Sequence, residues 1–314
     1  MKKYDVLVFG DVCVDLILSG GDVVPEFGQK EKLIGDYSLE MGGSTPIFAC
    51  QAAKLGLKTV IAGRVGKDQF GDLVCKTLQE AGVSLDRISR TDAVKTGLTV
   101  ALNTGDDRAM LTYLGTIDAV DSHDVDDALL DSIRHLHIGS YFLMKKLQPH
   151  YPAWIRRLKK NGATISLDTN WDPEEKWASG VWDIIPLMDM IFPNEAEAMA
   201  LTGETSVEMA VAKLCEFVPI VAVKKGKDGA TIHAEGRVFD VPALDVVKID
   251  AVGAGDSFDA GFVYGYLAGM QVEESARAGC ICGSLSAGAA GGTKGQPRLE
   301  EMMRFVKESE GNAL

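Results

Sequence analysis

One Gly-rich stretch constrains the fold of this chain most strongly. The sequence Asp250-Ala-Val-Gly-Ala-Gly-Asp256 leads directly into an apolar segment from Phe258 to Met270. Small residues let the backbone come close to a ligand and turn several N–H groups toward it. Because the N-terminus of a helix carries partial positive charge, the stretch predicts an anion site at the start of a helix.

Asp256 lies at the mouth of this predicted site. Its carboxylate would repel a bound phosphate, so we expect it to act as a base rather than as an anion ligand. Amides that hold a phosphoryl group, beside a carboxylate that accepts the proton of an attacking hydroxyl, indicate phosphoryl transfer. Taken alone, the string fits a Gly-rich turn with Asp256 as a helix N-cap equally well.

The rest of the chain alternates short apolar runs with longer amphipathic segments. Tyr4 to Gly10 is typical of a buried parallel strand, and residues 135–139, 149–161 and 163–167 predict a strand, a helix and a strand. This βαβ order predicts a doubly wound α/β fold with a mostly parallel sheet, which we expect to be one domain over residues 1–314.

The stretch from Asp250 to Phe262 resembles the C-terminal signature of the ribokinase-like, or phosphofructokinase B (PfkB), carbohydrate kinases. The Gly42-Gly43 pair and Gly63-Arg-Val-Gly-Lys-Asp68 resemble the N-terminal signature of the same family. The resemblance implies a ribokinase-like fold with a small β lid. It also implies transfer of the ATP γ-phosphoryl group to a hydroxyl of a ribose-, fructose- or 2-keto-3-deoxygluconate-like sugar.

The resemblance assigns catalytic roles to the central stretch. Asp256 would be the base, and the developing negative charge would be bound by N–H groups around three residues: Gly253, Ala254 and Gly255.

Substrate hydroxyls would be bound at two places. Asp11 and Asp15 follow the first predicted strand, where a carboxylate can bind a sugar or can be a solvated loop residue. In the family, the position matching Asp15 binds substrate hydroxyls. Gly42 and Gly43 allow a ligand to approach the backbone, although they also fit a plain turn before a helix.

The family's cofactors are ATP and Mg²⁺, with K⁺ in many members. The nucleotide and Mg²⁺ would be bound near a helix start and a Gly-spaced turn, with Mg²⁺ held through water by Glu197: Asn194, Glu197, Lys225, Gly226 and Gly229. Asn194 and Glu197 also fit a helix capping box. K⁺ would lie beside Asp250 and the Val252 carbonyl.

Two departures from the family pattern concern the substrate. Ile47 stands where many sugar kinases have Asn, and Asp172 stands where some keto-sugar kinases have Arg. An apolar Ile47 at a sugar hydroxyl should change which substrates are accepted. The lid strands are expected at about 12–41, including a strand from Leu33 to Met41, and at 96–115.

Composition excludes several classes of partner. The formal net charge of −13 argues against a broad nucleic-acid or anionic membrane surface. No long apolar segment is present, so we expect a cytoplasmic enzyme with a small-molecule substrate. The six cysteines form no C-x-x-C pair and predict reduced core thiols. A homodimer through the lid is expected by analogy.

Two other functions stay open on the sequence alone. One is a nucleoside kinase of the same fold. The other is a sugar- or nucleotide-binding sensor that has lost turnover, which the departures at Ile47 and Asp172 would suit.

Overall fold

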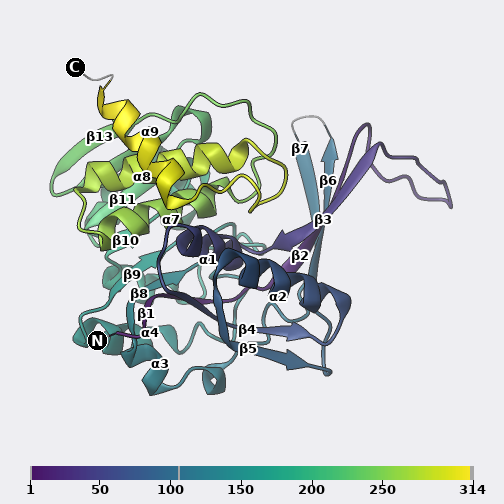
Figure 1. Ribbon diagram of the computed structural model, residues 1–314, viewed down its shortest axis with the longest axis horizontal. Coiled ribbons are helices and arrows are strands. Elements are labelled where there is room, and N and C mark those ends of the chain that lie inside the picture. The colour runs from purple at the N-terminus through teal and green to yellow at the C-terminus, as the bar shows by residue number, and fades with distance from the viewer. Residues whose placement is uncertain (1, 105–106, 312–314) are drawn as a thin grey trace.

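The computed structural model describes residues 2–104 and 107–311, which form a large sheet covered by helices and a small sheet that projects from it (Figure 1). Within these residues the large sheet has nine strands in the order β13-β12-β11-β10-β9-β8-β1-β4-β5. Their bounds are β1 (Tyr4–Phe9), β4 (Thr59–Gly66), β5 (Ser84–Thr91), β8 (Ile133–Ile138), β9 (Thr164–Leu167), β10 (Met190–Ile191), β11 (Ile220–Lys224), β12 (Ala230–Ala234) and β13 (Arg237–Val241).

The strands from β5 to β11 pair in parallel, and only the β11–β12–β13 hairpins at one edge are antiparallel. This confirms the predicted α/β fold with a mostly parallel sheet.

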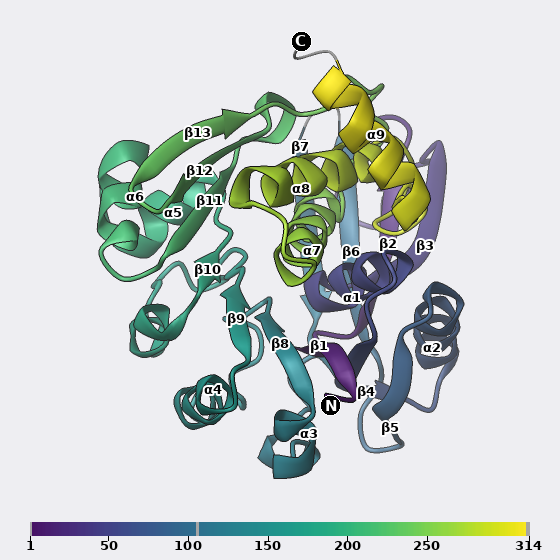
Figure 2. The same ribbon diagram turned by 60° about the vertical axis from the view of Figure 1, so that its left-hand side comes forward.

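Helices cover both faces of the large sheet (Figure 2). One face packs against α1 (Ser44–Lys54), α2 (Gln69–Ala81) and α7 (Ala254–Leu267), with α8 (Val272–Ala287) and α9 (Leu299–Gly311) beyond α7. The other face packs against α3 (Asp127–Asp131), α4 (Tyr151–Lys160), α5 (Glu195–Thr202) and α6 (Val207–Cys215).

Strand β1 shows why helices cover both faces of the large sheet. Its side chains alternate between faces, as those of any strand do. Leu7 and Phe9 are buried in the core that contains α3 to α6, while Val6 and Val8 are buried in the core that contains α1, α2 and α7. A strand that is apolar on both sides needs helices on both sides.

The small sheet has the order β3-β2-β6-β7. Its strands are β2 (Cys13–Ser19), β3 (Asp36–Gly42), β6 (Gly97–Thr104) and β7 (Asp107–Tyr113). The strand predicted from Leu33 begins only at Asp36, and Leu33 is 89% exposed in the preceding loop. Residues 105–106, in the predicted β6–β7 turn, lie outside the described part of the chain.

Two predictions about composition can be compared with the structure. Within the described residues, no helix has both the length and the apolarity that crossing a bilayer requires. All six cysteines are free and four are buried, but Cys215 is exposed, so the prediction of a core thiol is wrong there.

Candidate active site

The predicted anion site lies where α7 begins. Gly253 caps the helix with φ 72°, and a methyl group on it would lie 2.8 Å from both Gly292 and Ile47. Only glycine fits this turn without strain. In the first turn of α7, the N–H groups of Gly255 and Asp256 meet no acceptor among the described residues. The helix start can therefore bind an anion.

Asp256 lies on the first turn of α7 and is 9% exposed. Its Oδ1 accepts a hydrogen bond from the Ser44 hydroxyl at the start of α1. Burial raises the pKa of Asp256 to about 8, and the negative charge of Asp168 adds to the shift. A carboxyl group with such a pKa is a much stronger base than an exposed aspartate, and this suits proton abstraction from a hydroxyl.

Asp11 differs from the expectation that it binds substrate. Its carboxylate is 2% exposed and accepts four protein hydrogen bonds. The donors are the Ser44 N–H (2.8 Å), the Thr45 N–H (3.0 Å), the Thr45 hydroxyl (2.6 Å) and the Ser140 hydroxyl (2.5 Å). Because a carboxylate has about four acceptor positions, Asp11 is better described as the group that fixes the start of α1.

Asp15, Gly42 and Gly43 come together at the base of the small sheet. A methyl group on Gly42 would lie 2.2 Å from Asp15 Oδ1, and one on Gly43 would lie 2.3 Å from the Asp11 carbonyl oxygen. Gly43 also has φ 91°. Gly43 is therefore required by the backbone geometry, and Gly42 leaves room for the Asp15 carboxylate beside the start of α1.

The two departures from the family pattern have structural roles. Ile47 is 2% exposed, and its side chain lies against Gly253 and Gly292. The buried Ile47 side chain therefore packs against the turn that forms the anion site. Asp172 is 4% exposed and accepts the N–H groups of Glu174, Lys176 and Trp177, so it organises its own loop.

Asn194 and Glu197 form a capping box at the start of α5. Asn194 Oδ1 accepts the Glu197 N–H (2.9 Å), and Glu197 Oε2 accepts the Asn194 N–H (2.8 Å). Glu197 is 7% exposed. Burial, with the nearby charge of Asp168, raises its pKa to about 7. Within the described residues no cluster of three or more His, Cys, Asp or Glu could hold a metal directly, so a metal at Glu197 would need water as a further ligand.

The lysine prediction at the end of β11 needs a correction. The Lys225 ammonium donates to Thr231 (2.9 Å) and Asp240 (3.3 Å) on the β11–β13 hairpins, so its charge belongs to that surface. The lysine that reaches the centre of the site is its neighbour Lys224, which donates to Asp168 (2.6 Å) and Asp259 (3.5 Å).

The Gly-spaced turn after β11 contains two glycines with positive φ. Gly226 has φ 57° with open space around its Cα, and Gly229 has φ 86°. A methyl group on Gly229 would lie 2.0 Å from the Val241 carbonyl oxygen. Packing against β13 accounts for Gly229, while Gly226 leaves room for a ligand.

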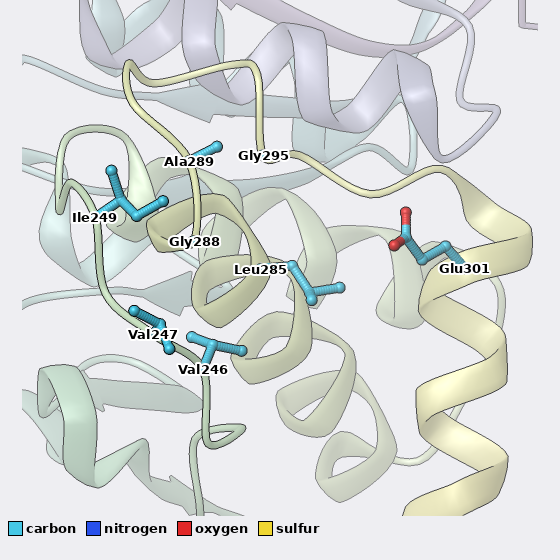
Figure 3. A pocket seen from close by; sticks show the side chains of 8 residues that line it. All are labelled: Val246, Val247, Ile249, Leu285, Gly288, Ala289, Gly295 and Glu301. Carbon is cyan, nitrogen blue, oxygen red and sulfur yellow. The ribbon is translucent and has the colours of Figure 1, made fainter.

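Asp250 ties together two loops beside the site. Its Oδ1 accepts the Val252 N–H and its Oδ2 accepts the Gly291 N–H, each at 3.0 Å. Beside these loops, and lined also by α8 and α9, lies an open, mostly apolar cavity of about 410 Å³ (Figure 3). Its lining residues are Val246, Val247, Ile249, Leu285, Gly288, Ala289, Gly295 and Glu301.

Four polar residues near the start of α7 were not among the residues predicted to form the site. Ser44, Asp168, Lys224 and Asp259 all contact one another or Asp256 near the start of α7. Ser44 follows the Gly42-Gly43 pair directly, so its position could have been suspected. Asp168 and Lys224 follow or end strands at the carboxyl edge of the sheet, which is where such folds bind ligands.

Comparisons with known proteins identify the family of this chain. The model of the pfkB family of carbohydrate kinases matches residues 3–299. An ATP-dependent ribose-1-phosphate kinase from Halopiger xanaduensis is 30% identical over 96% of this chain and 98% of its own length. A 2-dehydro-3-deoxygluconokinase from Bacillus subtilis is 28% identical over 97% and 96%.

Among solved structures, a putative ribokinase II from E. coli in complex with ATP and Mg²⁺ superposes with a TM-score of 0.85 and 26% identity. The superposition covers 97% of this chain and 99% of that one. With a family match over nearly its whole length and the ribokinase-like fold, this chain belongs to the pfkB family of carbohydrate kinases.

Proposed function

We propose that this protein transfers the γ-phosphoryl group of ATP to a hydroxyl of a small ribose-, fructose- or 2-keto-3-deoxygluconate-like sugar. The observation that carries the proposal is the juxtaposition of a buried Asp256 with the N–H groups at the start of α7. The carboxylate accepts the hydroxyl proton, and the amides stabilise the negative charge on the phosphoryl oxygens.

On the sugar side, Asp15 binds substrate hydroxyls from β2. It pairs with Glu40 on β3 and Thr99 on β6, so these side chains share one face of the small sheet. The opposite end of the substrate then lies toward Asp256, beside Ser44. In this arrangement the small sheet acts as a lid that excludes water from the reacting hydroxyl.

On the nucleotide side, the residues fit ATP and Mg²⁺. The apolar cavity of Figure 3 suits an adenine base, and the chain runs from its wall at Ile249 to the α7 start in a few residues. Gly226 and the α7 amides face the phosphates. Asn194 and Glu197 hold Mg²⁺ through water, and Mg²⁺ when bound neutralises phosphate charge.

A monovalent cation beside Asp250 and Val252 stays a prediction of the family resemblance. Both Asp250 oxygens already accept backbone N–H groups. Turnover compared in KCl and in choline chloride at equal ionic strength tests it, and equal rates would remove K⁺ from the account.

The substrate is tested by ATP consumption with a panel of pentoses, ketoses, deoxy-keto acids, sugar phosphates and nucleosides. We expect a phosphorylated sugar as product, detected by ³¹P NMR, and no product from the Asp256→Asn variant. Preference for nucleosides would favour the nucleoside kinase. ATP binding without turnover of any compound would contradict the kinase and favour a sensor. A cytoplasmic location, where ATP is supplied, is part of the proposal.

The outer face of the lid suits a homodimer. Alternation along the strands places a row of exposed apolar side chains opposite Asp15: Tyr37, Leu39, Leu111 and Tyr113. At the base of this face a cavity of about 860 Å³ is lined in part by Phe70 and Leu98. Exposed apolar patches of this kind mark interaction surfaces. Sedimentation at micromolar concentration should give twice the monomer mass, and Leu111→Glu should give monomers.

A further inference from the structure

A buried ammonium group lies at the carboxyl edge of the sheet, directly beneath the start of α7. Lys224 is the last residue of β11, and its side chain is 15% exposed. Its Nζ lies 2.6 Å from Asp168 Oδ2 and 3.5 Å from Asp259 Oδ1. The two acids come from the end of β9 and from the second turn of α7, with side chains 1% and 0% exposed. Three separate elements therefore hold one cation in place.

The two acids around Lys224 differ in charge. Burial raises the pKa of Asp259 well above its ordinary range, and the hydrogen bond with Asp168 adds to the shift. Burial also opposes ionisation of Asp168, but the Lys224 charge and the hydrogen bonds from Asp259 and Lys224 hold its pKa below the ordinary value. The pKa values of the two acids are thus shifted in opposite directions. The ammonium lies closest to Asp168, the acid whose pKa is lowered, so a positive charge and an acidic carboxylate are paired beside the helix start.

The ammonium reaches the anion site. A methyl group on Gly255 would lie 3.3 Å from Lys224 Nζ and 3.8 Å from its Cδ and Cε atoms. Glycine at 255 therefore leaves the space between the lysine and the helix start open. A lysine carries three donors, and the two acids take two of them. The third meets no acceptor among the described residues, and it lies beside the α7 amides that also lack one.

We propose that Lys224 donates this third N–H to the phosphoryl group in transfer, and that Asp168 and Asp259 are its positioning residues. The inference rests on the proposed kinase function and adds a positively charged side chain to its phosphate site. In the step, the bond from the substrate oxygen to the γ-phosphorus forms, and the bond from that phosphorus to the bridging oxygen of ADP breaks. The hydroxyl proton passes to Asp256. Lys224 offsets the negative charge that collects on the phosphoryl oxygens.

The neighbouring lysine provides a matched control. Lys225 differs from Lys224 by one position, yet its ammonium contacts Thr231 and Asp240 on the hairpins. Because the Lys225 ammonium is held on the hairpins, removal of its charge changes the protein's net charge without touching the anion site.

The test compares the binding of two nucleotides, with Mg²⁺, by calorimetry: ADP and the non-hydrolysable β,γ-imido analogue of ATP. A charge-assisted hydrogen bond to the γ-phosphoryl group predicts that Lys224→Met weakens binding of the analogue by about 10- to 100-fold. Binding of ADP should change less than about threefold, because ADP lacks the group that Lys224 contacts. Lys225→Met should leave both affinities unchanged.

A double variant controls for the possibility that Lys224→Met loses binding because it unfolds. Removing one partner of a buried ion pair leaves the other charge uncompensated, whereas neutralising both is well tolerated. Lys224→Met combined with Asp168→Asn should therefore stay folded and still lose the preference for the analogue over ADP. Lys224→Arg should keep part of the preference for the analogue over ADP, because the positive charge is retained.

The outcomes separate the inference from the proposed function. If the Lys224 variants keep the wild-type ratio of the two affinities, Lys224 does not touch the γ-phosphoryl group and the inference is wrong, while turnover of a sugar by the wild type still supports the kinase. If the wild type binds neither nucleotide, the proposed function itself fails.

Discussion

In the proposed function, the start of α7 has a substrate side and a phosphate side, and the pKa values of a carboxyl group on each side are shifted in opposite directions. On the substrate side, Asp256 has a hydrogen bond from Ser44 and no ion pair among the described residues, and its pKa is raised to about 8. On the phosphate side, Lys224 forms an ion pair with Asp168, whose pKa is lowered. A base needs proton affinity and a phosphate site needs positive charge, so the two acids are tuned in opposite directions by their partners.

The comparison also shows why one residue type can have several roles within a short distance. Asp11 accepts four hydrogen bonds and fixes the start of α1, whereas Asp259 is fully buried and its pKa is raised by that burial. Asp256 combines a raised pKa with a position on the first turn of α7 and no ion pair among the described residues, whereas Asp259 contacts Lys224. The surroundings of each aspartate, rather than its place in a motif, indicate its function.

The largest expected effect comes from Asp256→Asn. Loss of the base should lower kcat by about 10³-fold or more, because general base catalysis contributes up to about 10⁴-fold. The KM for ATP should change by less than about threefold, since the α7 amides remain. Initial rates at pH 8 measure both. A variant within tenfold of the wild-type kcat would contradict the distinction between the two sides.

A smaller loss is expected from Gly253→Ala, which disturbs the anion site that both sides share. The added methyl group would meet Gly292 and Ile47 at 2.8 Å, so the turn must shift. We expect kcat to fall by about 10²-fold, as for the loss of one oxyanion donor. Gly269→Ala is the control: its φ of 80° carries similar backbone strain, but nothing lies within 4 Å. Equal activity losses in the two variants would point to strain alone.

The smallest effect is expected from Ser44→Ala, which affects only the substrate side. The Ser44 hydrogen bond lowers the pKa of Asp256 against the effect of burial. Its removal should move the rising limb of the pH–rate profile to higher pH, so kcat near pH 7 falls several-fold while the plateau at high pH is kept. Binding of ADP should not change. A lower plateau with an unmoved limb would show that Ser44 acts in some other way.

Much of the fold could be predicted from local patterns in the sequence. The strand predicted from Tyr4 to Gly10 is observed as Tyr4–Phe9, and a helix begins directly after Gly43, as its glycine pair allowed. Both depend mainly on neighbours in sequence. The β3 strand was placed three residues early because Leu33 is apolar, although it lies in an exposed loop. Hydrophobicity alone does not distinguish a strand from a loop next to it.

The site could be located from the sequence but not assigned residue by residue. The Gly-rich stretch marked the α7 start, and Gly42-Gly43 marked the start of α1. Whether Lys224 or Lys225 contacts the site depends on which side chain points inward at the end of β11. The residues that contact Ile47 and Asp259 come from segments distant in the sequence. Such contacts are set by tertiary packing, which no local pattern encodes.

The pH dependence of kcat/KM in the wild-type enzyme tests the central claim most directly. The base must be unprotonated to accept the hydroxyl proton, and the pKa of Asp256 is raised to about 8. The account therefore predicts a rate that rises about tenfold per pH unit below pH 7, is half-maximal near pH 8 and levels off above about pH 9. A rate that is already independent of pH between 5 and 8 would contradict it, because Asp256 would then be an ordinary ionised carboxylate or would not be the base.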